Sequence, residues 1–380
     1  MPNRELLGGS YVRTGRPLGT AVRYWFECQL IDIFGVDVRP TATTADAICD
    51  QIAEHLALPT FRPRALFHWF AISVLATTDD PCDDPAGPYS TAGGPGLDRP
   101  GHTNLPPRSL FQARCAELPE LIARLGEVAN VGIETYAEWV VAMEQRRSYF
   151  IAHDATSTDH SHADVGTEPL DTLGAERRYA AALAGTIELA DEVALRHHML
   201  SEMARMATQD GLVMTLHRGI RRNHHGPTFD RFGSDTGHDI PLSASLTDAL
   251  RPLRQSFGIH PSLRLILFTL DESVFSRELA PLAGFYPSVY VKDPWWLLHA
   301  PHAVRRYREA ATGTVGFLRM SGFIDDTRAF CSIPAPHDMS RRLDSGYLAQ
   351  LMAEHRLDED ETAETAIDLA VSRPKEAIKL

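Results

Sequence analysis

Short apolar segments alternate with amphipathic helical segments along most of the chain, and this alternation limits the fold more than any other feature of the sequence. In 45–57, for example, Ile48, Ile52 and Leu56 recur at helical spacing. Apolar segments that end in polar residues are typical of buried strands, and their alternation with helices favours a parallel sheet, open or closed. We predict strands in 67–81, 155–164, 212–217, 263–273, 288–296 and 315–326, and helices in 45–57, 116–127, 131–149, 177–208, 301–311 and the C-terminal tail.

Polar residues follow each predicted strand. In a (β/α) barrel the carboxyl ends of all strands meet at one mouth, where active sites are built. An open doubly wound sheet uses only the loops near its switch point. No glycine-rich phosphate-binding motif follows a strand, so nucleotide binding is disfavoured. The polar residues at these ends are Asp79, Asp80, His160, His217, Asp271, Asp293, Asp326 and Arg328.

Composition restricts the compartment and the partners. The chain has 380 residues, of which 44% are hydrophobic, and a net charge of −13, so it can bury a large core and is not expected to bind nucleic acid or an acidic membrane. Its five cysteines form no C-x-x-C pair, which favours a reduced, cytoplasmic protein. No apolar run reaches transmembrane length.

The stretch "TDHSHAD" (158–164) contains His-x-His, the arrangement with which one strand can hold a metal ion. On an extended strand His160 and His162 point to the same side. The alternative is two polar residues in a loop, because so short a motif often occurs by chance.

Two further residues at strand ends are candidates for chemistry. His217 ends the strand "LVMTLH" and could bind a metal, or could be a hydrogen-bonded histidine of the scaffold. Asp326 lies in "DDTR" and could bind a metal or act as a general base, or could cap the next helix.

Arginine and tryptophan side chains supply the candidates for substrate binding. Arg64 and Arg328 could bind a substrate carboxylate through paired hydrogen bonds, although a lone arginine is more often structural. The pair Trp295-Trp296 could form the floor of a sugar site, although core packing is the more common role.

Six motifs together resemble the uronate isomerase family over about 25–342. They are "TTDDP" (77–81), "IARLGEV" (122–128), Asp159-His160, "LHRGIRRNHH" (216–225), Trp295-Trp296 and "FIDDTRAF" (323–330). The family is an outlying branch of the amidohydrolase superfamily. The resemblance implies an α/β fold, a distorted (β/α)8 TIM barrel with additional helices. It also implies the interconversion of glucuronate with fructuronate and of galacturonate with tagaturonate.

The resemblance also implies roles for individual residues. His217 matches a metal-binding histidine, and Asp326 matches an aspartate that binds the metal and carries the proton. Arg64 and Arg328 match the arginines of two family motifs. One tryptophan of the Trp295-Trp296 pair is expected to contact substrate, and His160 is expected at the mouth, where it would also bind substrate. The family's metal-binding His-x-His belongs to the first barrel strand, so His162 is expected to mimic that motif by chance.

The family's first strand, with its His-x-His, is not found in the sequence. We therefore expect the barrel to be incomplete at its N-terminus, in a truncated copy or a diverged relative. A divalent metal, zinc in the first instance, is expected only if the missing histidines are encoded upstream, because His217 and Asp326 alone are too few ligands for a catalytic zinc. Without those histidines we expect no cofactor and poor activity.

The expected organisation is a helical region in 1–70, the barrel in 71–337 and C-terminal helices of the same domain in 338–380. The expected partner is a uronate; no nucleic acid and no membrane are expected, and a homo-oligomer is left open. Two other functions remain open, a metal-dependent hydrolase of the amidohydrolase type and an inactive sugar-acid-binding homologue.

Overall fold

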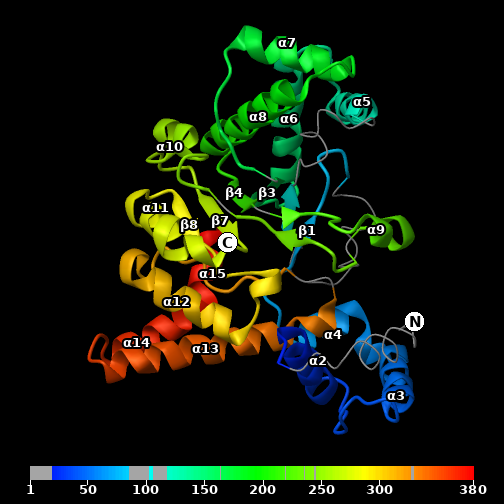
Figure 1. The fold of residues 1–380 in the computed structure, drawn as a ribbon, viewed down its shortest axis with the longest axis vertical. Helices are drawn as coiled ribbons and strands as arrows, with labels where there is room; N and C mark the ends of the chain where they lie inside the picture. The colour runs from blue at the N-terminus through cyan, green and yellow to red at the C-terminus, as the bar shows by residue number, and fades with distance from the viewer. Residues whose placement is uncertain are drawn as a thin grey trace.

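The computed structural model describes residues 19–84, 118–162, 164–218, 220–234, 236–243, 245–326 and 329–380, and the backbone of 102–105. A parallel six-stranded sheet lies at the centre of the molecule, with its strands neighbouring one another in chain order (Figure 1). The strands are β1 (Ala76–Thr78), β2 (His102–Leu105), β3 (Ser157–His162), β4 (Val213–Arg218), β7 (Leu265–Thr269) and β8 (Val289–Val291).

The sheet continues past β8 through a single parallel bridge between Val291 and Met320. Among the described residues, no pairing joins this end of the sheet to β1, so a closed barrel is not seen. A separate antiparallel pair, β5 (Ile220–Arg221) and β6 (Ile240–Pro241), follows β4. The fold is therefore α/β, with a sequentially ordered parallel sheet and a majority of helices.

Helices surround the sheet and make up most of the described chain (Figure 1). The α-helices are α2 (Ala21–Asp32), α3 (Ala45–Ala57), α4 (Pro63–Trp69), α5 (Leu118–Ala129), α6 (Tyr136–Ile151), α7 (Thr172–Leu183), α8 (Leu189–Asp210), α9 (Gly226–Phe232), α10 (Arg251–Phe257), α11 (Ala280–Phe285), α12 (Pro301–Val315), α13 (Pro334–Ala353), α14 (Glu359–Ile367) and α15 (Arg373–Ala377). None of the helices in this part of the chain is both long and apolar enough to span a membrane.

Several sequence predictions are confirmed by these bounds and three are wrong. The helix in 45–57 is α3, and β4, β7, β8 and α12 lie where strands and a helix were predicted. The single helix predicted in 177–208 is interrupted between α7 and α8, where Gly185 adopts a φ of +67°. The strand predicted in 67–81 is reduced to β1, because Pro63 begins a helix that buries Leu66 and Phe67. The strand predicted in 315–326 is reduced to the bridge at Met320.

The two faces of the sheet bury different residues, as the alternation of side chains along a strand requires. Met214 and Leu216 of β4 join the large core formed with the helices. Val213 of β4, Ile266 and Phe268 of β7 and Tyr290 of β8 form a second cluster with Ala377 of α15. We call this second side, where α15 packs, the inner face.

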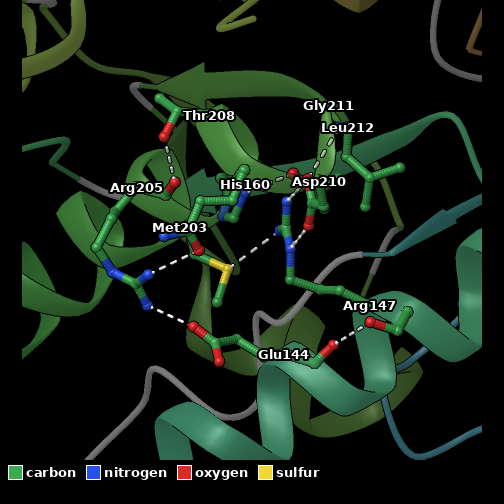
Figure 2. A network of polar contacts seen from close by, with 12 residues as sticks. Glu144, Arg147, His160, Met203, Arg205, Thr208, Asp210, Gly211 and Leu212 are labelled. Carbon is green, nitrogen blue, oxygen red and sulfur yellow. Dashed lines mark hydrogen bonds and ion pairs between the residues drawn. The ribbon is translucent and has the colours of Figure 1, made fainter.

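A buried ion pair joins α6 to the end of α8 on the helix-facing side of the sheet (Figure 2). The Arg147 guanidinium donates to both carboxylate oxygens of Asp210, at 2.5 and 2.9 Å, and approaches the sulfur of Met203 at 3.7 Å. Asp210 in turn accepts from the backbone N–H of Leu212, directly before β4. The network therefore fixes the point at which the chain leaves α8 and enters the sheet.

The N-terminal helices α2, α3 and α4 form a smaller core of their own. Leu30, Ile48, Phe61 and Leu66 are buried in it, and Phe330 packs against it. The 3-10 helix Phe330–Ser332 contacts both α2 and α4. This unit therefore lies beside the segment that follows Asp326.

Candidate active site

The carboxyl ends of β3, β4 and β7 place polar and aromatic side chains together on the inner face. Asp159 of β3 is aligned with Thr215 of β4, and His217 is aligned with Phe268 of β7. Because aligned residues of parallel strands point to the same side, these four side chains share the face on which Val213 and Ile266 are buried.

Asp159 determines how the His217 ring is held. The Nδ1 of His217 lies 2.6 Å from Oδ1 of Asp159, and the Thr215 hydroxyl donates to the same oxygen at 2.7 Å. The ring lies against Phe268, tilted by 37° with 3.9 Å between centroids, and meets Trp295 edge-on at 4.7 Å. A carboxylate against Nδ1 favours the tautomer with a proton on that atom, so Nε2 is the atom that can accept from a ligand.

Lys292 extends this row of side chains to the next strand. It lies two residues beyond Tyr290 and is 3% exposed. Its ammonium lies 5.5 Å from the centroid of the Phe268 ring and 5.3 Å from that of Phe323, and donates to the carbonyl of Asp293 at 3.2 Å. Burial lowers the pKa of Lys292 to about 8, against the opposing effect of nearby carboxylates.

The carboxylates of Asp325 and Asp326 lie near this ammonium. Burial raises the pKa of Asp325 to about 6; the charge of Asp326 raises it further, while Lys292 acts in the opposite direction. The side chain of Asp325 is 8% exposed, whereas Asp326 is exposed. The site thus contains one shielded carboxyl group and one open carboxyl group next to a cation.

Two histidines complete this cluster, His299, which is buried, and His337, which is half-buried. The Nδ1 of His299 lies 3.8 Å from Oδ1 of Asp325. Phe323 contacts the rings of both His299 and His337, at 5.2 and 5.0 Å. Burial is the main cause that lowers the pKa of His299 to about 3 and that of His337 to about 4, so both rings are neutral at physiological pH.

A charged network on the opposite side of β8 holds the strand end in place. Arg308 of α12 donates to Asp293 at 2.8 Å and to both carboxylate oxygens of Asp344 in α13, at 2.7 and 2.9 Å. All three side chains are buried. Because Asp293 directly follows Lys292, this network fixes the backbone on which Lys292 is carried.

The structure places the residues predicted for the site in different surroundings. His217 and Trp295 are in contact, and Trp296 lies next to Trp295 and under the guanidinium of Arg222, at 5.1 Å. Arg64 lies in the first turn of α4 and is half-buried, on the unit that packs beside the segment following Asp326. Arg328 lies outside the described residues.

His160 and His162 point away from this site. They are aligned with Leu216 and Arg218, on the side of β3 opposite to Asp159. His160 is fully buried, lies 3.0 Å from the Thr158 hydroxyl, and is drawn beside the Arg147–Asp210 pair in Figure 2. The structure therefore does not bring His160 together with His217, and its predicted contact with substrate stays a prediction.

The donor set does not by itself fit a catalytic metal. In the described part of the chain, no three or more His, Cys, Asp or Glu side chains gather in a way that could hold an ion. A catalytic zinc usually has three protein ligands. His217, with its Nδ1 held by Asp159, has the arrangement of a metal ligand. Together His217 and Asp326 supply only two protein ligands.

Four titratable residues of the cluster around Phe323 were not among the predicted site residues: Lys292, Asp325, His299 and His337. The signal for Lys292 was present in the sequence, because a charged residue two positions after a buried strand residue points to the same face. The chain also has only three lysines, Lys292, Lys375 and Lys379, so a lysine within a strand segment is unusual here.

Comparison with known proteins identifies the relatives of the chain. The family model described as glucuronate isomerase matches residues 13–376. The uronate isomerase of Cutibacterium acnes is 46% identical over 362 residues, which cover 95% of this chain and 77% of that protein. The uronate isomerase of Corynebacterium efficiens is 44% identical, with the same coverage of both chains.

Solved structures give the same result. The crystal structure of glucuronate isomerase from Caulobacter crescentus is 38% identical, with a TM-score of 0.92, and the match covers 99% of this chain and 78% of that one. A uronate isomerase from Thermotoga maritima, at 19% identity, shares the fold with a TM-score of 0.90. The chain therefore belongs to the glucuronate isomerase family, and its enzyme class is that of the isomerases.

Proposed function

We propose that the chain interconverts glucuronate with fructuronate and galacturonate with tagaturonate, by moving a proton between C2 and C1 of the open-chain sugar. The observation that carries this proposal is the row of groups on the inner face at the strand ends, from Asp159 and His217 to Lys292 and the Asp325-Asp326 pair. Family membership gives the class of substrate. The sequential order of the parallel strands supports a distorted (β/α)8 barrel whose mouth is this site.

In this proposal Asp326 is the base. It is the open carboxylate of the pair, so it can reach a substrate. His217 presents Nε2 to a sugar hydroxyl, because Asp159 occupies the other side of its ring. Arg64 and Arg328 bind the substrate carboxylate, and the indole of Trp295 or Trp296 packs against the sugar.

The metal, the cytoplasmic location and a homo-oligomeric state stay predictions. A divalent ion bound at this mouth would include His217 and Asp326 among its ligands and would act as a Lewis acid. The proton transfer assigned to Asp326 takes place on the protein's own carboxylate.

The test is turnover of uronates followed by NMR. Protein of residues 1–380 is incubated with D-glucuronate or D-galacturonate, and the appearance of the ketose is measured. We expect slower turnover for substrate deuterated at C2, because that C–H bond breaks. Asp338→Asn, an exposed aspartate of α13, is the matched control for Asp326→Asn.

Each alternative function gives a different result in this assay. Hydrolysis of ester or amide substrates without ketose formation favours the hydrolase. Binding of uronates without any turnover favours the sugar-acid-binding homologue. Either result contradicts the proposed isomerisation.

A further inference from the structure

Lys292 is a cation held in apolar surroundings at the mouth of the sheet. Its ammonium lies between the rings of Phe268 and Phe323, and the hydrogen bond found for it within the described residues goes to the carbonyl of the residue that follows it. An ammonium has three donors, and burying it with few partners is unfavourable. An apolar side chain of the same length would pack at least as well in this position.

Lys292 lies beside the residues that are proposed above to act on the substrate. Phe268 contacts the His217 ring and also lies 5.5 Å from the Lys292 ammonium, so the ammonium belongs to the row of side chains at the site. It also lies near Asp325 and Asp326, whose charges raise its pKa and so oppose the effect of burial. A cation beside the proposed base, Asp326, would contact the carbonyl oxygen on C1 and the hydroxyl oxygen on C2 of the substrate.

A second observation supports a ligand at this cluster. The Nε2 atom of His299 is buried and has no hydrogen-bond partner within the described residues. The ring itself is 5% exposed and contacts Phe323, which also contacts Lys292. A neutral histidine with one open nitrogen is a hydrogen-bonding group for a sugar hydroxyl.

We propose that Lys292 is a further catalytic residue of the isomerisation, in which its ammonium binds the C1 oxygen and carries a proton between O1 and O2. This role rests on the function proposed above. In this role the Lys292 ammonium stabilises the oxyanion that forms at O1 when C2 loses its proton.

The steps balance without a further reactant. Asp326 takes the proton of C2, the electrons of that bond form a C1–C2 double bond, and the carbonyl pair moves to O1. The Lys292 ammonium gives a proton to O1, and the resulting amine takes the proton of the O2 hydroxyl. The O2 electron pair then forms the C2 carbonyl while C1 takes the proton from Asp326. With a pKa of about 8, Lys292 can exist both as the ammonium and as the amine near neutral pH, as a proton carrier must.

The experiment compares Lys292→Gln and Lys292→Arg with the wild type, and uses Lys375→Gln, at an exposed lysine of α15, as the matched control. The kcat and KM are measured with the uronate that the wild type turns over fastest. Calorimetry gives the affinity for an open-chain sugar-acid hydroxamate, whose planar group resembles the enediolate. The same measurement is made with the sugar acid in which C1 is an alcohol. Circular dichroism checks that each variant is folded.

We expect Lys292→Gln to lower kcat by roughly 10²–10³-fold, the usual cost of one oxyanion donor, with a much smaller change in KM. Affinity for the hydroxamate should fall by a similar factor and affinity for the alcohol should change little. Lys292→Arg keeps the charge and should retain more hydroxamate affinity than Lys292→Gln. Lys375→Gln should match the wild type.

The outcomes separate this proposal from the function on which it rests. If the wild type isomerises uronates and Lys292→Gln keeps both kcat and hydroxamate affinity, the role of Lys292 is overturned and the function stands. Equal loss of affinity for hydroxamate and alcohol also overturns it, because that result shows a structural role. If the wild type turns over no uronate but loses hydroxamate affinity through Lys292→Gln, the function is wrong and the placement of Lys292 stands. If the wild type neither isomerises uronates nor binds the hydroxamate, both are wrong.

Discussion

Replacing Lys292 with methionine should stabilise the protein while it removes activity. The ordinary pKa of lysine, 10.5, falls to about 8 at this position, mainly because the ammonium is buried. At about 1.4 kcal/mol per pKa unit, the charged form is disfavoured in the folded state by about 3 kcal/mol relative to the unfolded chain. Methionine keeps the apolar stem against Phe268 and Phe323 and adds favourable contacts between sulfur and ring. We therefore expect Lys292→Met to raise the free energy of unfolding at pH 7 by about 3 kcal/mol.

The pH dependence of that difference has a definite sign. Between pH 8 and 10.5 the unfolded chain keeps the proton on Lys292 and the folded chain releases it, so the wild type gains stability as pH rises. Below pH 8 Lys292 is protonated in both the folded and the unfolded chain, so its contribution to the free energy of unfolding no longer changes with pH. The advantage of Lys292→Met should therefore be full at pH 7 and should disappear as the pH approaches 10.5.

Urea unfolding of the wild type, Lys292→Met and Lys375→Met at a series of pH values measures this difference. Titrating groups far from Lys292 are shared by the three proteins and cancel in the comparison. Lys375 is exposed, so Lys375→Met should match the wild type throughout. If Lys292→Met is less stable than the wild type at pH 7, the ammonium has stabilising partners and the reasoning from its burial is refuted.

Three further substitutions test the site and the scaffold. Asp326→Asn should keep the fold and abolish uronate isomerisation in the NMR assay, because the amide cannot take a proton; full activity would remove Asp326 from the mechanism. Arg64→Met should weaken binding of uronates by about 1.5–3 kcal/mol and leave the neutral parent sugars little changed; equal weakening of both, measured by calorimetry, would indicate a structural role. Arg147→Met should lower the free energy of unfolding in urea by about 3–5 kcal/mol, because it leaves the Asp210 carboxylate without its partner; exposed Arg342→Met is the control, and a similar effect in both would contradict this estimate.

The sequence predicted the sheet more successfully than the residues that point into the site. The positions and the chain order of the strands follow from apolar runs such as 212–217 and 263–270. A strand that is covered on both faces of the sheet must be apolar along its length. The side to which a strand residue points is harder to predict when both sides are polar. In β3, "STDHSH", Asp159 and His160 are equally polar, and only the pairing with β4 turns Asp159 toward His217 and His160 toward the helices.

Pairing between distant segments also explains why Lys292 was not predicted. The surroundings of Lys292 come from Phe268 on β7 and Phe323 beyond the bridge at Met320, which are far apart in the sequence. The sequence near position 292 indicates that Lys292 shares a face with Tyr290, but not which rings surround its ammonium. Residues whose role depends on a neighbouring strand are visible only once the register of that strand is known.

The position of α15 has a consequence for the order in which the chain folds. Ala377 packs on the inner face, and the Lys379 ammonium donates to the carbonyls of Gly211 and Ser262, 168 and 117 residues earlier in the chain. Contacts of such sequence separation form slowly, because a long loop must close first. During synthesis, β7 leaves the ribosome about 100 residues before the helix that covers it, and β4 about 155 residues before that helix. Their inner face is therefore open to chaperones, and to other nascent chains, for as long as that stretch takes to translate.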